Sequence, residues 1–104
     1  MTGVELISKE RREQIEKHGR TVQMDVDHNR AYQLAEAASV LTTEKFRNSK
    51  HRFSLMPEEW DDEISLKMCK KGRKERLAIA GALIAAELDR IIENEKDNIL
   101  NFII

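Results

Sequence analysis

The chain has 104 residues, of which 36% are charged and 40% hydrophobic, with four glycines and one proline. This length and composition predict a single domain, residues 1–104, built from helices with charged outer faces. Eighteen basic and nineteen acidic residues leave a net charge of −1, which argues against a nucleic acid or an anionic membrane as partner. The single cysteine, Cys69, excludes an internal disulfide, and no apolar run is long enough to span a membrane, so we expect a cytoplasmic protein.

The first predicted helix begins at the N-terminus. Thr2 followed by Glu5 matches the T-x-x-E capping box, in which each side chain accepts a backbone N–H of the other residue. Gly19 is a natural left-handed stop, so we expect this helix to end just before it. Glu13 and Glu16 lie on its charged side. They either belong to a solvated face paired with arginines, which we favour, or point into a polar cavity.

The second predicted helix covers residues 28–43. Residues 20–27 lack a helical period and are expected to form a loop, with Asp25 or, preferably, Asp27 as the N-cap of the helix. His28 is expected on the surface or as a partner of the cap, and Glu36 beside the apolar face. That face consists of Ala31, Leu34, Ala35, Ala38 and Leu41.

A basic run with interleaved aromatics, KFRNSKHR, follows at residues 45–52. Such a run can bind phosphates or single-stranded nucleic acid. Because the run is short and the chain is nearly neutral, we favour a solvated loop that tucks Phe46 and Phe53 into the core.

The third predicted helix begins with Pro57 in its first turn and ends at Gly72. Acidic residues crowd its N-terminal end and lysines its C-terminal end, an arrangement that complements the helix dipole. Its buried stripe is expected to contain Trp60, Ile64 and Met68.

The last predicted helix, residues 73–95, is the most apolar part of the chain. Residues 77–86 contain no charge, which is typical of a helix buried on several sides, so we place it at the centre of the fold. Glu87 shares one helical stripe with Ile84 and Ile91, an unfavourable position for a carboxylate without a partner.

These elements predict an all-α fold, an antiparallel bundle of about four helices around a buried central C-terminal helix. The tail, residues 97–104, is apolar and carries one charge, Asp97. An exposed apolar segment usually packs on a partner or on the core, so we expect a homo-oligomer, with the tail as a contact.

Short segments spread over residues 10–92 carry a family resemblance. They are ERREQIE at residues 10–16, Gly19 and Thr21, Asp25 and His28, Leu34-Ala35 and Ala37-Ala38, Pro57 and Trp60, and Arg76-Leu77 with AGALIAAE at residues 80–87 and Arg90. Together they resemble the small phage and prophage proteins that are grouped with MazG-like all-α nucleotide pyrophosphohydrolases.

The resemblance implies an enzyme that binds a nucleoside triphosphate through Mg²⁺ and cleaves between the α and β phosphates. Mg²⁺ prefers carboxylate ligands, and helical bundles supply these from several helices. The candidate metal ligands are Glu36 and Glu87, with Glu13 and Glu16 in addition. The candidate substrate-binding residues are Asp25, His28, Gln33 and Trp60. The resemblance assigns no catalytic residue.

The chain departs from the family pattern at both acidic motifs, and it has Ile79 and Arg20 where the relatives usually carry lysine and tryptophan. MazG-type enzymes pair an E-x-x-E with an E-x-x-D motif, whereas residues 33–36 begin with glutamine and the aspartate after Glu87 comes two residues on, at Asp89. The alternative is therefore a non-catalytic helical binding or assembly module of phage origin that has lost the metal-binding acids. In that case Glu87 is expected to pair with a basic residue such as Arg11 or Arg76.

Overall fold

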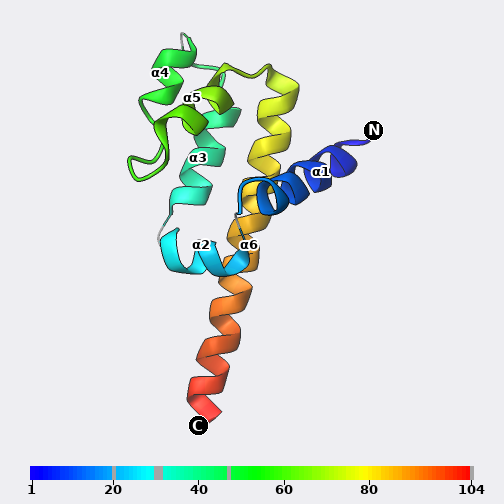
Figure 1. The fold of residues 1–104 in the computed structure, drawn as a ribbon, viewed down its shortest axis with the longest axis vertical. Helices are drawn as coiled ribbons and strands as arrows, with labels where there is room; N and C mark the ends of the chain where they lie inside the picture. The colour runs from blue at the N-terminus through cyan, green and yellow to red at the C-terminus, as the bar shows by residue number, and fades with distance from the viewer. Residues whose placement is uncertain (20, 30–31, 47, 104) are drawn as a thin grey trace.

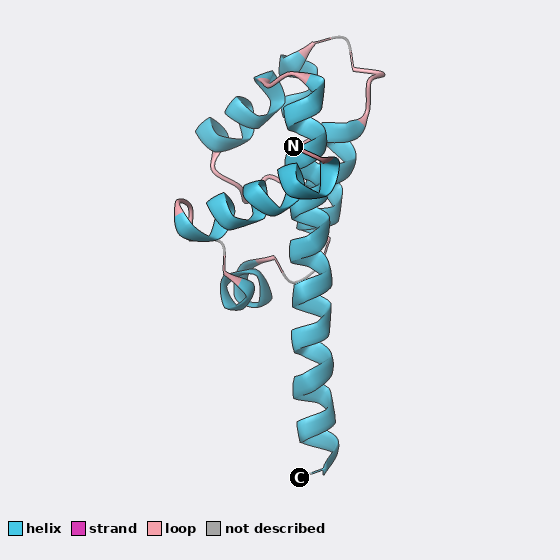
Figure 2. Cartoon of the chain, turned by 90° about the vertical axis from the view of Figure 1, so that its right-hand side faces the viewer, coloured by secondary structure: helices cyan, strands magenta, loops and turns pink. Residues whose placement is uncertain are grey.

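The computed structural model describes residues 1–19, 21–29, 32–46 and 48–103, with side chains as far as residue 96, and this part of the chain forms six helices (Figure 1). They are α1 (Gly3–Glu16), α2 (Val22–His28), α3 (Gln33–Thr42), α4 (Ser49–Phe53), α5 (Asp62–Lys70) and α6 (Arg73–Ile103). Figure 2 shows helices and loops over this part of the chain. The predicted all-α fold is confirmed.

Helix α6 is the axis of the fold, as predicted. Helices α1, α2 and α3 all pack against it, while α4 and α5 pack against each other beside its N-terminal end (Figures 1 and 2). The C-terminal half of α6 projects beyond the other described helices in both views. Over the described residues, no helix combines the length and the apolar character needed to cross a membrane. The tail's side chains, residues 97–104, lie outside the described residues, so its proposed oligomer contact stays a prediction.

The N-terminal helix begins as the capping box predicts. The Thr2 hydroxyl accepts the backbone N–H of Glu5 at 3.2 Å, and the Glu5 carboxylate accepts the N–H of Thr2 at 3.2 Å. Gly19 has φ 64°, the left-handed conformation that glycine adopts without a steric penalty. Both ends of α1 are therefore set by local chemistry that the sequence shows directly.

The loop predicted for residues 20–27 is wrong, because α2 occupies most of it. Thr21 caps this helix, accepting the backbone N–H of Met24 at 3.2 Å, so Asp27 lies inside α2 and is not a cap. The next helix, α3, begins at Gln33 rather than residue 28. Ala31 lies outside the described residues and Ala35 is exposed. The buried face of α3 consists of Leu34, Ala37, Ala38, Val40 and Leu41.

The segment between α3 and α5 also differs from the prediction. The short helix α4 interrupts the predicted loop at residues 45–52, although Phe46 and Phe53 do pack against the core. Helix α5 begins after Pro57, because the Asp61 carboxylate caps it by accepting the N–H of Ile64 at 3.0 Å. Ile64 is consequently exposed, and the buried face of α5 consists of Ser65, Met68 and Cys69.

The core lies on one side of α6. Its alanines are small enough to let neighbouring helices approach closely, and Leu34, Leu41 and Leu83 fill the space between them with fully buried side chains. The prediction that this helix is buried on several sides is wrong for its outward face. Leu77, Ile84 and Leu88 remain exposed there, because α1, α2 and α3 cover the other faces.

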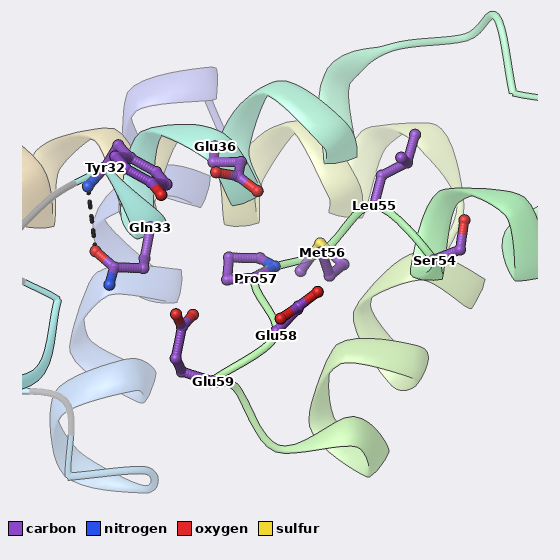
Figure 3. Close-up of a pocket in the computed structure, with 9 residues that line it drawn as sticks. All are labelled: Tyr32, Gln33, Glu36, Ser54, Leu55, Met56, Pro57, Glu58 and Glu59. Atoms are coloured by element: carbon purple, nitrogen blue, oxygen red, sulfur yellow. Dashed lines mark hydrogen bonds between the residues drawn. The ribbon is translucent and has the colours of Figure 1, made fainter.

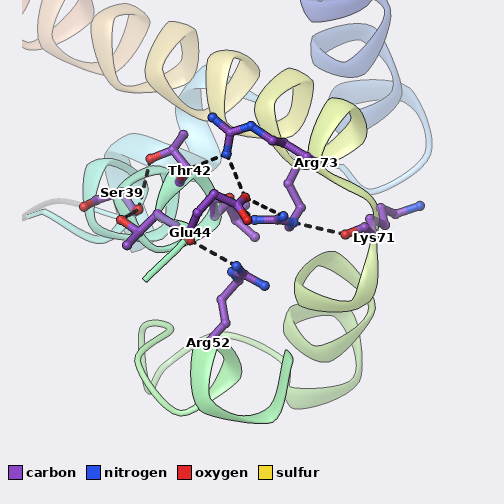
Figure 4. A network of polar contacts seen from close by, with 9 residues as sticks. Ser39, Thr42, Glu44, Arg52, Lys71 and Arg73 are labelled. Atoms are coloured by element: carbon purple, nitrogen blue, oxygen red, sulfur yellow. Dashed lines mark hydrogen bonds and ion pairs between the residues drawn. The ribbon is translucent and has the colours of Figure 1, made fainter. Parts of the chain in front are cut away.

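Two arginines of α6 hold the C-terminal end of α3 (Figure 4). Arg76 is buried and donates hydrogen bonds to the backbone oxygens of Leu41 at 2.9 Å and Lys71 at 3.0 Å. Arg76 and Arg73 each donate to one oxygen of Glu44 at 2.7 Å. The last turn of a helix has unsatisfied carbonyls and a partial negative charge, and α3 has no basic residue of its own there. The guanidinium groups of α6 supply both the donors and the charge.

Replacing Glu44 with glutamine is expected to make the melting temperature of the protein depend less on pH. The hydrogen bonds from Arg76 and Arg73 lower the pKa of Glu44 from its ordinary value of 4.5. A carboxylate with a lowered folded-state pKa stabilises the protein above its unfolded value, and this contribution is lost as the pH falls through the folded value. Glu44→Gln should therefore melt below the wild type at pH 7, and the two melting temperatures should converge below pH 4.5. A gap in melting temperature that is the same at pH 7 and pH 3 would contradict this assignment.

Candidate functional site

An acidic cavity lies between the N-terminal end of α3 and the segment that precedes α5 (Figure 3). Its volume is about 400 Å³, within the usual range for small-molecule sites. Glu36 projects from α3 on one side, and Glu58 and Glu59 come from the segment on the other. The remaining lining residues are Tyr32, Gln33, Ser54, Leu55, Met56 and Pro57.

The segment bearing Glu58 and Glu59 is held at both ends. Met56 and Pro57 are buried, and the Trp60 backbone N–H donates to the Pro57 carbonyl at 3.2 Å, which closes a tight turn. Both glutamates are exposed within that turn and line the cavity, and in Figure 3 Pro57 lies between them and Glu36. The fixed φ of proline and the buried methionine thus hold the two glutamates in the wall of the cavity that Glu36 also lines.

A buried polar chain anchors this turn to α2. The Trp60 indole N–H donates to Oδ1 of Asn29 at 2.9 Å, and the Asn29 amide donates to Oδ1 of Asp25 at 2.8 Å. Asp25 is fully buried and Asn29 nearly so. Two predicted substrate-binding residues, Asp25 and Trp60, are therefore joined through Asn29, and in this arrangement they position the turn beside the cavity.

The other predicted substrate-binding residues lie in different surroundings. Gln33 lines the cavity, and its Oε1 accepts the backbone N–H of Tyr32 at 3.1 Å (Figure 3). His28 is exposed in the last turn of α2 and is not among the residues that line the cavity. Of the four predicted residues, only Gln33 lines the cavity. Trp60 directly follows a lining residue, Glu59, in the sequence.

The four predicted metal ligands are spread over the described structure. Glu36 lines the acidic cavity, and Glu16 is exposed on α1. Glu13 lines a second cavity of about 290 Å³ between α1 and α5, together with Glu10 and Lys71. Burial, and then the charge of Glu13, raise the pKa of Glu10 there, while Lys71 opposes the shift. Across residues whose positions are described, no three or more His, Cys, Asp or Glu side chains form a group that could hold a metal ion.

Glu87 on α6 has a basic partner, but not one of those expected. It forms a short ion pair with Arg90, one turn further along the same helix, and both side chains are largely buried. Arg11 instead pairs with Asp89 at 3.4 Å, and Arg76 with Glu44 at 2.7 Å. The spacing of three residues between Glu87 and Arg90 is a signal present in the sequence.

Sequence reasoning missed the second wall of the cavity. Glu58 and Glu59 were interpreted as dipole partners of a helix beginning at Pro57, whereas α5 begins at Asp62 and leaves both glutamates outside it. The signal that could have found them is the acidic pair between Pro57 and Trp60, two residues suited to a tight turn.

Comparisons of the chain with protein-family models, with curated proteins and with solved structures found no match. The resemblance to MazG-like proteins therefore stays a prediction. What the structure adds is an acidic cavity, the neighbouring Trp60 and the polar chain that holds it in place.

Proposed function

We propose that this protein is a MazG-like nucleotide pyrophosphohydrolase that binds a nucleoside triphosphate with Mg²⁺ at the acidic cavity. The observation that supports it best is the presence of Glu36, Glu58 and Glu59 around one space of about 400 Å³. In the reaction, water adds to the α-phosphorus and the bond from that phosphorus to the α–β bridging oxygen breaks. The products are a nucleoside monophosphate, pyrophosphate and a proton.

The charge of the cavity makes a cation necessary for this function. Three carboxylates repel a triphosphate, so the nucleotide binds there only with its charge neutralised. Mg²⁺ is commonly held by one or two carboxylates together with substrate phosphates, which fits Glu36 with Glu58 or Glu59. When bound, the metal would screen the phosphates and stabilise the charge that develops on the leaving pyrophosphate.

Tyr32 offers a place for the nucleoside. Its side chain is exposed at the rim of the cavity, on the same side as Gln33 (Figure 3). Every nucleobase has a π-face that can stack on such an aromatic ring, so Tyr32 supports binding without selecting one base.

Pyrophosphate release from a panel of nucleoside triphosphates, with Mg²⁺ or Mn²⁺, tests the proposal. We expect Glu36→Gln to lower the rate about 100-fold or more, because it removes a charged ligand from the site. Glu63→Gln is the matched control, since Glu63 is exposed on α5 and does not line the cavity. No release from any nucleotide, together with no Mg²⁺-dependent rise in melting temperature, would rule the function out.

One observation favours the alternative, a non-catalytic helical binding or assembly module. The ion pair with Arg90 neutralises Glu87, the predicted metal ligand on the central helix. A protein that neither binds nor cleaves any nucleotide of the panel, but folds and associates normally, would support this second function.

A further inference from the structure

The outward face of α6 carries a row of exposed aliphatic side chains. These side chains are between 39% and 56% exposed. They belong to Leu77, Ile84, Leu88, Ile91 and Ile92. The buried Ala82 and Ala86 lie on the opposite face. The row continues along the helix toward the half that projects beyond the rest of the described chain (Figures 1 and 2).

The spacing of the row indicates what kind of surface covers it. Residues 77, 81, 84, 88, 91 and 95 are separated alternately by four and three positions, the heptad pattern of helices that pack along one another. Gly81 is already covered by Ile7 of α1, whereas the aliphatic residues around it remain exposed. A second helix running along α6 would bury them.

The charges at the two ends of the row select the partner and its direction. Lys74 and Glu95 are exposed and lie on the same side of α6 as the row. A parallel copy would place Lys74 beside Lys74 and Glu95 beside Glu95, whereas an antiparallel copy pairs opposite charges. We propose that the row binds the same row of a second copy of this chain, packed antiparallel across a twofold axis near Ile84. This proposal does not depend on the proposed catalysis.

In the antiparallel register, a side chain of the second copy also fills a hollow beside the row. If Lys74 pairs with Glu95 of the second copy, Ile92 of that copy lies opposite Leu77. A mainly apolar hollow of about 200 Å³ adjoins Leu77, between α1 and α6. It is lined by Gly3, Leu6, Ile7, Lys74, Leu77 and Ala78, and an aliphatic side chain suits it.

Sedimentation equilibrium over a range of protein concentrations tests the interface. The wild type should be a dimer, and Leu88→Glu should weaken it about 100-fold or more, because each dimer would bury two unpaired carboxylates. Ile64→Glu is the matched control, since Ile64 is an exposed aliphatic residue on α5 that shares a cavity with Ile79, on the covered side of α6. Circular dichroism should show unchanged helix content in both variants. A monomeric wild type, or a dimer that Leu88→Glu leaves intact, would overturn the proposal.

A charge exchange tests the direction of packing. In the antiparallel dimer, Lys74→Glu places two carboxylates together at each end and should weaken association about fivefold at low salt. Adding Glu95→Lys to that variant should restore the wild-type affinity, and high salt should reduce all of these differences. If Lys74→Glu has no effect, or Glu95→Lys fails to restore affinity, the antiparallel register is wrong.

Discussion

Replacing Arg76 with alanine is expected to lower the free energy of unfolding by about 2–4 kcal/mol. The Arg76 guanidinium is buried and bonds the Leu41 and Lys71 carbonyls and the Glu44 carboxylate, so its loss leaves backbone acceptors without a donor. The C-terminal turn of α3 also loses one of the positive charges beside it. Urea denaturation followed by circular dichroism measures the change.

Arg73→Ala is the matched control for this prediction. Arg73 donates to the same oxygen of Glu44, but its side chain is about half exposed, so removing it should cost less than about 1 kcal/mol. Arg76→Lys should fall between the two, because an ammonium group cannot reach all of the acceptors that the planar guanidinium bridges. Equal losses for Arg76→Ala and Arg73→Ala would show that the buried backbone contacts contribute little.

Replacing Gly81 with leucine is expected to destabilise the protein by about 1–3 kcal/mol. A Cβ at this position would lie 2.6 Å from Cδ1 and 2.7 Å from Cγ1 of Ile7, closer than van der Waals contact allows. Since β-branched side chains have few rotamers in a helix, Ile7 cannot easily move aside and α1 must shift away from α6. Thermal unfolding of the variant should show the loss.

Two comparisons separate crowding from other effects of removing a glycine. Gly3 also lies in a helix, but a Cβ there would meet no atom within 4 Å, so Gly3→Ala should be neutral or slightly stabilising. In an Ile7→Ala background, Gly81→Leu should cost less than in the wild type, because the space beside Gly81 is larger. An equal cost in both backgrounds would mean that contact with Ile7 is not the cause.

The parts of the fold that the sequence predicts are those with local causes. The capping box of Thr2 and Glu5 and the left-handed Gly19 need only neighbouring residues, and both are where we expected them. Helix α2 was missed because it has seven residues, too few for a hydrophobic period to emerge. The start of α5 was placed too early, because Pro57 suits a first helical turn but the N-cap is Asp61, four residues later.

The candidate site was harder to predict, because distant contacts build it. Glu36 could be placed beside the apolar face of its helix from spacing alone, but its cavity depends on a turn some twenty residues later along the chain. That turn is positioned by the Trp60–Asn29 hydrogen bond, which joins residues far apart in sequence. Periodicity likewise identified an apolar α6 without showing which of its faces the other helices would leave open.

The position of Trp60 gives the protein an internal optical reporter. It is the sole tryptophan of the chain, it follows Glu59 directly, and its half-buried indole is bonded to Asn29. Indole emission responds to polarity and hydrogen bonding, so a ligand that displaces this turn will change the intrinsic fluorescence of the unlabelled protein. Titrations at the acidic cavity can therefore be followed without attaching a dye or altering a residue.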